Sequence, residues 1–196
     1  VKEAKHLTLD QIRHLLVSVK DREYGLAIWV QLYLGLRVGE LQALKWDDLD
    51  LEEGILRIHR TFVRKEMRLR DYPKGRRQHS HRIPVEVLQW LREVKPSAKS
   101  EFVVTSTENG MLSYEWYHRS LKRYCKALNL PIIGTHSLRH STSEMYLSHG
   151  ASPYDIQTLF AHSSLDVTER YVHNRGESLE RISNVIRMFP KCSQTA

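Results

Sequence analysis

Apolar residues recur at helical spacing along most of this chain, and this periodicity is the strongest constraint on its fold. Thr8 and Gln11 have the spacing of a capping box, which predicts a helix whose buried stripe is Ile12, Leu15, Leu16 and Val19. The same periodicity predicts further helices near residues 22–33, 38–44, 114–128, 137–148, 154–160, 165–173 and 178–188. The chain is therefore predicted to be mainly α-helical.

One region between residues 55 and 85 breaks the helical pattern. Strand-forming residues dominate three of its segments, which are Ile55–Ile58, Thr61–Val63 and His81–Val85. The segment from Arg64 to Arg77 is dense in Lys and Arg and is predicted to be a basic loop, and Phe102–Val104 is predicted to be a short edge strand. The predicted fold class is mainly α with a small antiparallel β-sheet (α+β), in one domain that spans residues 1–196.

The charge balance favours a polyanionic partner. Lys and Arg number 30 against 23 Asp and Glu, which gives a formal net charge of +7. Such a surplus favours contact with phosphate backbones, because each neutralised phosphate releases condensed counterions. The longest largely apolar stretch, Gly25–Leu36, is interrupted by Gln31 and is too short to span a bilayer, so no membrane partner is expected. Cys125 and Cys192 have no metal-ligand spacing and fit a reducing cytoplasm.

Two charged residues stand in an apolar stretch, Leu34–Leu41. Arg37 and Glu40 are three positions apart, so on a helix they share one face. A cation among apolar neighbours needs a partner or an anionic ligand. The pair is therefore either a plain ion pair or part of an anion-binding site.

A second charged cluster lies in the segment Thr135–His140. His136 and Arg139 are three positions apart, near the start of a predicted helix. His136 and His140 have the spacing of two zinc ligands, but Ser137 stands where a zinc hydrolase motif needs glutamate. A metal site is therefore not expected here.

Three further residues prove little alone: Lys74, His162 and Tyr171. Together with the earlier ones they follow a pattern that resembles the tyrosine recombinase (phage integrase) family. That family has an arginine in a stretch like Leu-Gly-Leu-Arg-x-Gly-Glu-Leu, a hairpin lysine, a His-x-x-Arg pair, a later histidine or tryptophan, and a tyrosine. The matching residues here are Arg37 with Glu40 beside it, Lys74, His136, Arg139, His162 and Tyr171, and Lys65 is an alternative for the hairpin lysine.

The resemblance implies a catalytic-domain fold and a site-specific recombinase that cuts and rejoins DNA. Tyr171 would be the nucleophile, the two arginines and His162 would stabilise the phosphate, and Glu40 would support them. His136 would handle the proton of the tyrosine, and Lys74 would protonate the leaving 5′-oxygen. No cofactor or metal is implied.

The resemblance also implies the partners. These are double-stranded DNA and further copies of the chain, as a tetramer on DNA that exchanges C-terminal tails through the stripe Leu179, Ile182, Val185 and Ile186. That stripe has the alternative role of closing the protein's own core. The upstream core-binding domain of the family is expected to be absent, and the location is expected to be the cytoplasm of a prokaryote, on the nucleoid. The competing functions are DNA relaxation of the type IB topoisomerase kind, a non-catalytic helix-turn-helix regulator and a zinc hydrolase.

Overall fold

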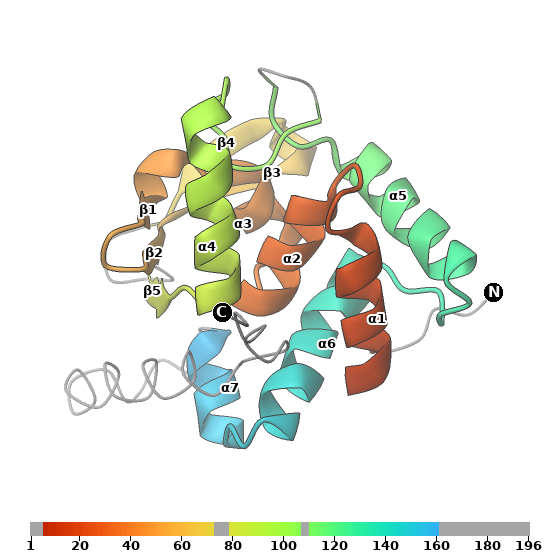
Figure 1. Cartoon of the computed structure of the whole chain (residues 1–196). Helices are drawn as coiled ribbons and strands as arrows, with labels where there is room; N and C mark the ends of the chain where they lie inside the picture. Colours follow the sequence, from red (N-terminus) through yellow and green to blue (C-terminus); the bar gives the residue numbers. More distant parts are fainter. Residues whose placement is uncertain (1–5, 73–78, 107–109, 161–196) are drawn as a thin grey trace, which may run out of the picture.

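The computed structural model describes residues 6–72, 79–106 and 110–160. These segments contain α-helices, short 3-10 helices and short antiparallel strands (Figure 1). The α-helices are α1 (Leu9–Val19), α2 (Gly25–Leu34), α3 (Val38–Ala43), α4 (Val85–Val94), α5 (Tyr114–Ala127), α6 (Thr135–Ser148) and α7 (Pro153–Leu159). The 3-10 helices are η1 (Trp46–Asp48), η2 (Arg64–Glu66) and η3 (Lys95–Ser97).

Helix α1 begins as the sequence predicts. The hydroxyl of Thr8 accepts a hydrogen bond from the backbone N–H of Gln11, and the side chain of Gln11 accepts one from the N–H of Thr8 at 3.0 Å. This reciprocal arrangement satisfies two backbone donors at the helix start. The four residues of the predicted stripe, Ile12, Leu15, Leu16 and Val19, are all buried.

Helix α2 lies in the middle of the molecule, with α4 and the strands on one side and α1 and α6 on the other (Figure 1). Nearly all of its residues are buried, as expected for a helix that is apolar all round. It begins at Gly25 and not near Arg22, because Tyr24 has a left-handed backbone (φ 60°). A side chain at Gly25 would also collide with the carbonyl of Val19, which explains the glycine.

The carbonyl groups at the C-terminal end of α2 are satisfied by side chains of α6. The hydroxyl of Thr142 donates to the carbonyl oxygen of Leu32 at 2.7 Å, and the hydroxyl of Tyr146 donates to that of Tyr33 at 2.7 Å. Both contacts are buried. They join α2 to α6 at the helix end where backbone acceptors lack intrahelical partners.

The strands form two small antiparallel sheets where one was predicted. The first has the order β1 (Leu49–Asp50), β2 (Ile55–Ile58) and β5 (His79–Arg82), and the second pairs β3 (Arg60–Val63) with β4 (Arg68–Asp71). The prediction of a continuous basic loop from Arg64 to Arg77 is therefore wrong, because part of it is strand β4. The strand predicted over His81–Val85 ends at Arg82, because Pro84 caps α4 at its N-terminus.

Other sequence expectations differ in detail or lie outside the described residues. Phe102 forms one isolated antiparallel bridge with Lys45, and the segment Phe102–Val104 does not form the edge strand that was predicted. Helices α5, α6 and α7 match the predicted ranges within two residues at either end. The helices predicted near 165–173 and 178–188 lie outside the described residues.

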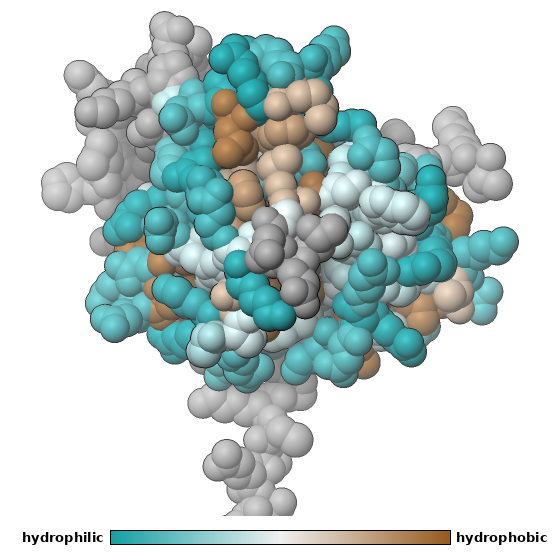
Figure 2. All heavy atoms as spheres, turned by 90° about the horizontal axis from the view of Figure 1, so that it is seen from above, coloured by the Kyte–Doolittle hydropathy of each residue, from teal (hydrophilic) through white to brown (hydrophobic). Residues whose placement is uncertain are grey.

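A connected hydrophobic core runs through the described segments, from α1 to the end of α7. The outer surface is polar: Figure 2 shows hydrophilic residues over most of the face seen from above, with hydrophobic residues in smaller patches. Within the described residues no helix is long and apolar enough to cross a membrane.

Replacing Tyr146 with Phe should remove one buried hydroxyl donor, so that the carbonyl oxygen of Tyr33 loses this hydrogen bond. We expect the free energy of unfolding, measured by urea denaturation, to fall by about 1–2 kcal/mol. The control is Tyr124→Phe, because the hydroxyl of Tyr124 donates to the carbonyl of Glu23 at an exposed site where water can replace it. Equal losses in the two variants would show that the buried α2–α6 hydrogen bond contributes no more to the free energy of unfolding than the exposed one.

Candidate active site

Arg37 stands at the tight turn between α2 and α3. Gly35 makes this turn with a left-handed backbone (φ 59°), and a side chain there would collide with the ring of Phe160. Arg37 then caps α3, and its backbone N–H donates to Glu40 Oε2 at 2.8 Å. Its guanidinium is half exposed and donates to Glu40 Oε1 at 3.1 Å, so the two residues form the ion pair that their spacing allows.

The carboxylate of Glu40 is buried, with 2% of its side chain exposed, and several donors converge on it. Besides Arg37, the hydroxyl of Tyr72 donates to Oε1 at 3.0 Å, and Arg139 Nη1 lies 3.8 Å from Oε2. Burial and the charge of Glu40 raise the pKa of Tyr72 to about 12, so this hydroxyl keeps its proton at neutral pH. Glu40 therefore links α3, the end of β4 and α6.

Arg139 is held at the cavity by the backbone of two other segments. Its guanidinium donates to the carbonyl oxygens of Gly35 and of Phe160, the latter at 3.1 Å, and lies 4.2 Å above the ring of Phe160. Burial, and secondly the charge of Arg37, lower the pKa of Arg139 to about 10. This value still lies far above neutral pH, so the group keeps its charge.

The start of α6 is fixed by a buried glutamine of α2. Gln31 Nε2 donates to the carbonyl oxygens of Leu36 and Thr135, and the hydroxyl of Tyr117 donates to Gln31 Oε1 at 2.6 Å. These bonds tie the α2–α3 turn to the first residue of α6. His136 follows directly, with an exposed side chain whose Nε2 lies 3.0 Å from His140 Nε2.

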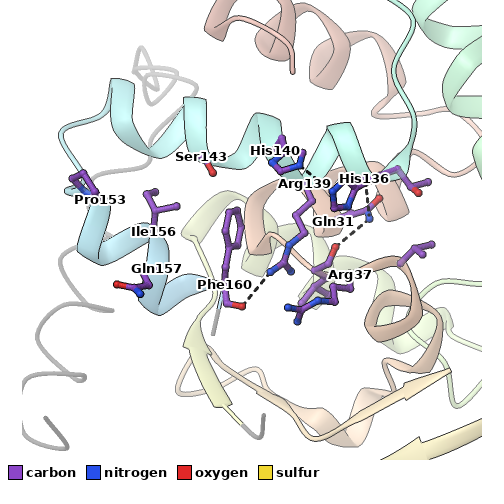
Figure 3. Close-up of a pocket in the computed structure, with 13 residues that line it drawn as sticks. Gln31, Arg37, His136, Arg139, His140, Ser143, Pro153, Ile156, Gln157 and Phe160 are labelled. Atoms are coloured by element: carbon purple, nitrogen blue, oxygen red, sulfur yellow. Dashed lines mark hydrogen bonds between the residues drawn. The ribbon is translucent and has the colours of Figure 1, made fainter. Parts of the chain in front are cut away.

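A cavity of about 570 Å³ brings these groups together (Figure 3). Arg37, His136 and Arg139 line one part of it, and Figure 3 shows them gathered where α6 faces the α2–α3 turn. An apolar part of the wall comes from the α2–α3 turn and from α7 with its C-terminal residue, and consists of Leu36, Val38, Pro153, Ile156 and Phe160. The cavity therefore combines a cationic end with an apolar wall.

Several predicted site residues are not brought to this cavity by the described structure. Lys74, His162 and Tyr171 lie outside the described residues. Lys65 lies in η2, is exposed, and is not among the residues that line the cavity. Their assignments stay predictions.

Sequence reasoning missed three residues that shape the site: Gln31, Tyr72 and Phe160. Gln31 was noted only as an interruption of an apolar stretch, although a buried amide needs partners and so marks a structural junction. No local sequence pattern indicates a role for Tyr72 or Phe160, because their partners Glu40 and Arg139 are distant in sequence.

The described residues contain no group of three or more His, Cys, Asp or Glu side chains that could hold a metal ion. What the cavity does present is two guanidiniums, of Arg37 and Arg139, and two imidazoles, of His136 and His140. A guanidinium is a planar fork of donors that matches the oxygens of phosphate or carboxylate. The arrangement suits an anionic oxyacid, and above all a phosphate.

Replacing Glu40 with Gln should remove the charge that lies between Arg37 and Arg139. Because this carboxylate is buried, we expect the free energy of unfolding in urea to fall by about 3 kcal/mol. The control is Glu101→Gln, whose carboxylate pairs with Lys45 at 2.9 Å with 63% of the side chain exposed, and whose expected loss is under about 1 kcal/mol. A loss for Glu40→Gln no larger than the control's would contradict its linking role.

Comparison with known proteins places this chain in a family. The family model described as the phage integrase family matches residues 5–178. Tyrosine recombinase XerC of Thermodesulfovibrio yellowstonii is 32% identical, over 86% of this chain and 58% of its own length. XerC of Pelotomaculum thermopropionicum is 30% identical, over 92% of this chain and 58% of its own length. The chain thus spans less than two thirds of the length of these relatives.

Solved structures support the fold. The Tn1549 transposon integrase, in complex with transposon right end DNA, superimposes with a TM-score of 0.71 at 20% identity, over 91% of this chain and 62% of that one. The lambda integrase catalytic core gives a TM-score of 0.57 at 22% identity, over 83% of this chain and 96% of that one. The predicted fold class, mainly α with small antiparallel sheets as in a tyrosine recombinase catalytic domain, is confirmed. Because the family match covers most of its length, the chain belongs to the phage integrase family of tyrosine recombinases.

Proposed function

We propose that this chain is the catalytic domain of a site-specific DNA recombinase, which cleaves and rejoins DNA through a covalent 3′-phosphotyrosyl intermediate. The observation that carries the proposal is the meeting of Arg37, from the α2–α3 turn, with His136 and Arg139, from the distant helix α6, at one cavity. Family membership and this convergence support the same function independently.

The reaction explains why two arginines are needed. A phosphodiester attacked in line gathers negative charge on its non-bridging oxygens, and fixed guanidiniums stabilise that charge without being reorganised. Arg139 is rigidly held by backbone carbonyls, whereas Arg37 is half exposed and accessible. In the proposed site the two arginines clamp the phosphate, and His162 adds a further hydrogen bond.

Two further residues carry out the proton transfers of the proposed reaction. Tyr171 attacks the phosphorus atom, His136 accepts or relays the phenolic proton, and Lys74 protonates the departing 5′-oxygen. The phosphorus–oxygen bond broken in the DNA is replaced by one to tyrosine. The bond energy is thus retained, and a 5′-hydroxyl of a partner strand can reverse the step without ATP.

Double-stranded DNA is the proposed partner. The net charge of +7 favours it, and α5 adds an exposed Trp116 with the Arg119 guanidinium 4.9 Å from its ring. The lambda integrase tetramer bound to a Holliday junction, with a TM-score of 0.58, supports assembly as a tetramer on DNA. Exchange of C-terminal tails and a place on the cytoplasmic nucleoid remain part of the proposal.

Other functions account for fewer of the observations. A type IB topoisomerase shares the phosphotyrosine chemistry, and a relaxation assay on supercoiled plasmid separates it from a recombinase. A helix-turn-helix regulator explains the positive charge but gives no reason for a buried carboxylate that holds two arginines at a cavity. A zinc hydrolase requires ligands beyond His136 and His140.

Tyr171→Phe should abolish a covalent protein–DNA adduct. Because the target site is unknown, the protein is incubated with a library of nicked duplexes, which trap the adduct by releasing the cut strand, and is run on a denaturing gel. The wild type should give a shifted band and the variant none, with DNA binding unchanged, because phenylalanine lacks only the nucleophilic oxygen. Tyr154→Phe, at an exposed tyrosine of α7, is the control and should keep the band. A band that persists in Tyr171→Phe would overturn the assignment.

The hairpin lysine can be identified from the leaving group. Lys74→Ala should slow cleavage by about 10²-fold or more if this lysine is the general acid. A substrate with sulfur in place of the bridging 5′-oxygen should restore the rate, because a thiolate leaves without protonation. Lys65→Ala should behave like the wild type on both substrates. Rescue of Lys65→Ala in place of Lys74→Ala would reverse the assignment.

A further inference from the structure

Two histidines on one face of α6 contact each other at the cavity. His140 lies one turn after His136, and both line the cavity wall (Figure 3). Their Nε2 atoms are 3.0 Å apart, and the rings meet edge to face with an interplanar angle of 87°. A hydrogen bond between two imidazole nitrogens requires that one carries the proton and the other accepts it. In a hydrogen bond along this line, one Nε2 donates and the other accepts, and the tautomers of the two rings decide which does which.

The contact matters because of how His136 is otherwise held. Its backbone is fixed, since Gln31 binds the carbonyl of the preceding Thr135. Its side chain is exposed, so its orientation is not set by close packing. Arg139, in contrast, is buried and bound by two backbone carbonyls. Among the described residues, the contact with His140 Nε2 is the polar contact of the His136 ring, and it is what orients that ring.

We propose that His140 is a positioning residue for His136. It holds the His136 imidazole at the cationic end of the cavity, beside Arg37 and Arg139, and fixes which nitrogen carries the proton. The inference rests on the proposed function, because the orientation of His136 affects a reaction only if His136 contacts the phosphate or moves the tyrosine proton. A ring misplaced by a fraction of its own width loses much of its effect on the rate.

Substitutions at His140 can separate this role from simple packing. Glutamine places an amide atom as many bonds from Cα as Nε2 is, so His140→Gln can keep the hydrogen bond to His136. Asparagine places its amide atom where Nδ1 lies, too short to reach, and His140→Ala removes the group. Gln and Asn have the same chemistry, so they differ mainly in reach.

The first measurement is the rate of covalent adduct formation on nicked duplex DNA, with DNA affinity measured in parallel. We expect His140→Ala and His140→Asn to slow the reaction about tenfold at unchanged affinity. We expect His140→Gln to stay within about threefold of the wild type. His14→Ala, at an exposed histidine of α1 away from the cavity, is the control and should have no effect. Equal rates for the Gln and Asn variants would overturn the proposal.

The second measurement needs no DNA and separates this inference from the proposed function. Nitrogen-15 NMR of the whole chain reports the proton on each imidazole nitrogen. The Nε2 signal of His136 should shift in His140→Ala and stay near its wild-type position in His140→Gln. If the wild type forms no adduct, the proposed function fails, and the NMR result alone decides whether the pair exists. An unchanged His136 signal in His140→Ala would refute it.

Discussion

The buried carboxylate of Glu40 is the contact on which the geometry of the cavity depends. It is approached by Arg37 from its own helix, by Tyr72 from the end of β4 and by Arg139 from α6. Without it, two guanidiniums would face each other in a partly desolvated place, where like charges repel strongly. With it, two cations and one anion leave a single net positive charge, which matches the single negative charge of a phosphodiester.

Helix α6, which carries Arg139, also completes the backbone hydrogen bonding at the end of α2. The last carbonyls of a helix lack intrahelical partners, and here side chains of α6 donate to those of Leu32 and Tyr33. Two residues further along, the carbonyl of Gly35 accepts from Arg139. Arg139, Thr142 and Tyr146 thus follow one another along α6, and all three donate to the end of α2 or to the turn after it. The packing of α6 on α2 and the position of Arg139 therefore depend on each other.

The sequence predicted what is local and missed what depends on distant partners. The capping box of Thr8 and the Arg37–Glu40 pair are set by spacings of three residues, and both were predictable. The contact between Glu40 and Arg139 joins two segments far apart in the chain, and no residue type announces it. Strand β4 was missed for another reason: all of its residues are exposed, so it has no buried alternation that would reveal a strand.

The meeting of Arg37, Arg139 and Phe160 has a consequence for the growing chain on the ribosome. Arg37 and Glu40 are made before Arg139, which follows only after both sheets and α5 have been made. The backbone carbonyl of Phe160, which anchors Arg139, emerges later still. A half-made chain therefore cannot assemble the cationic end of the cavity, and synthesis itself delays the appearance of a site that could engage nucleic acid.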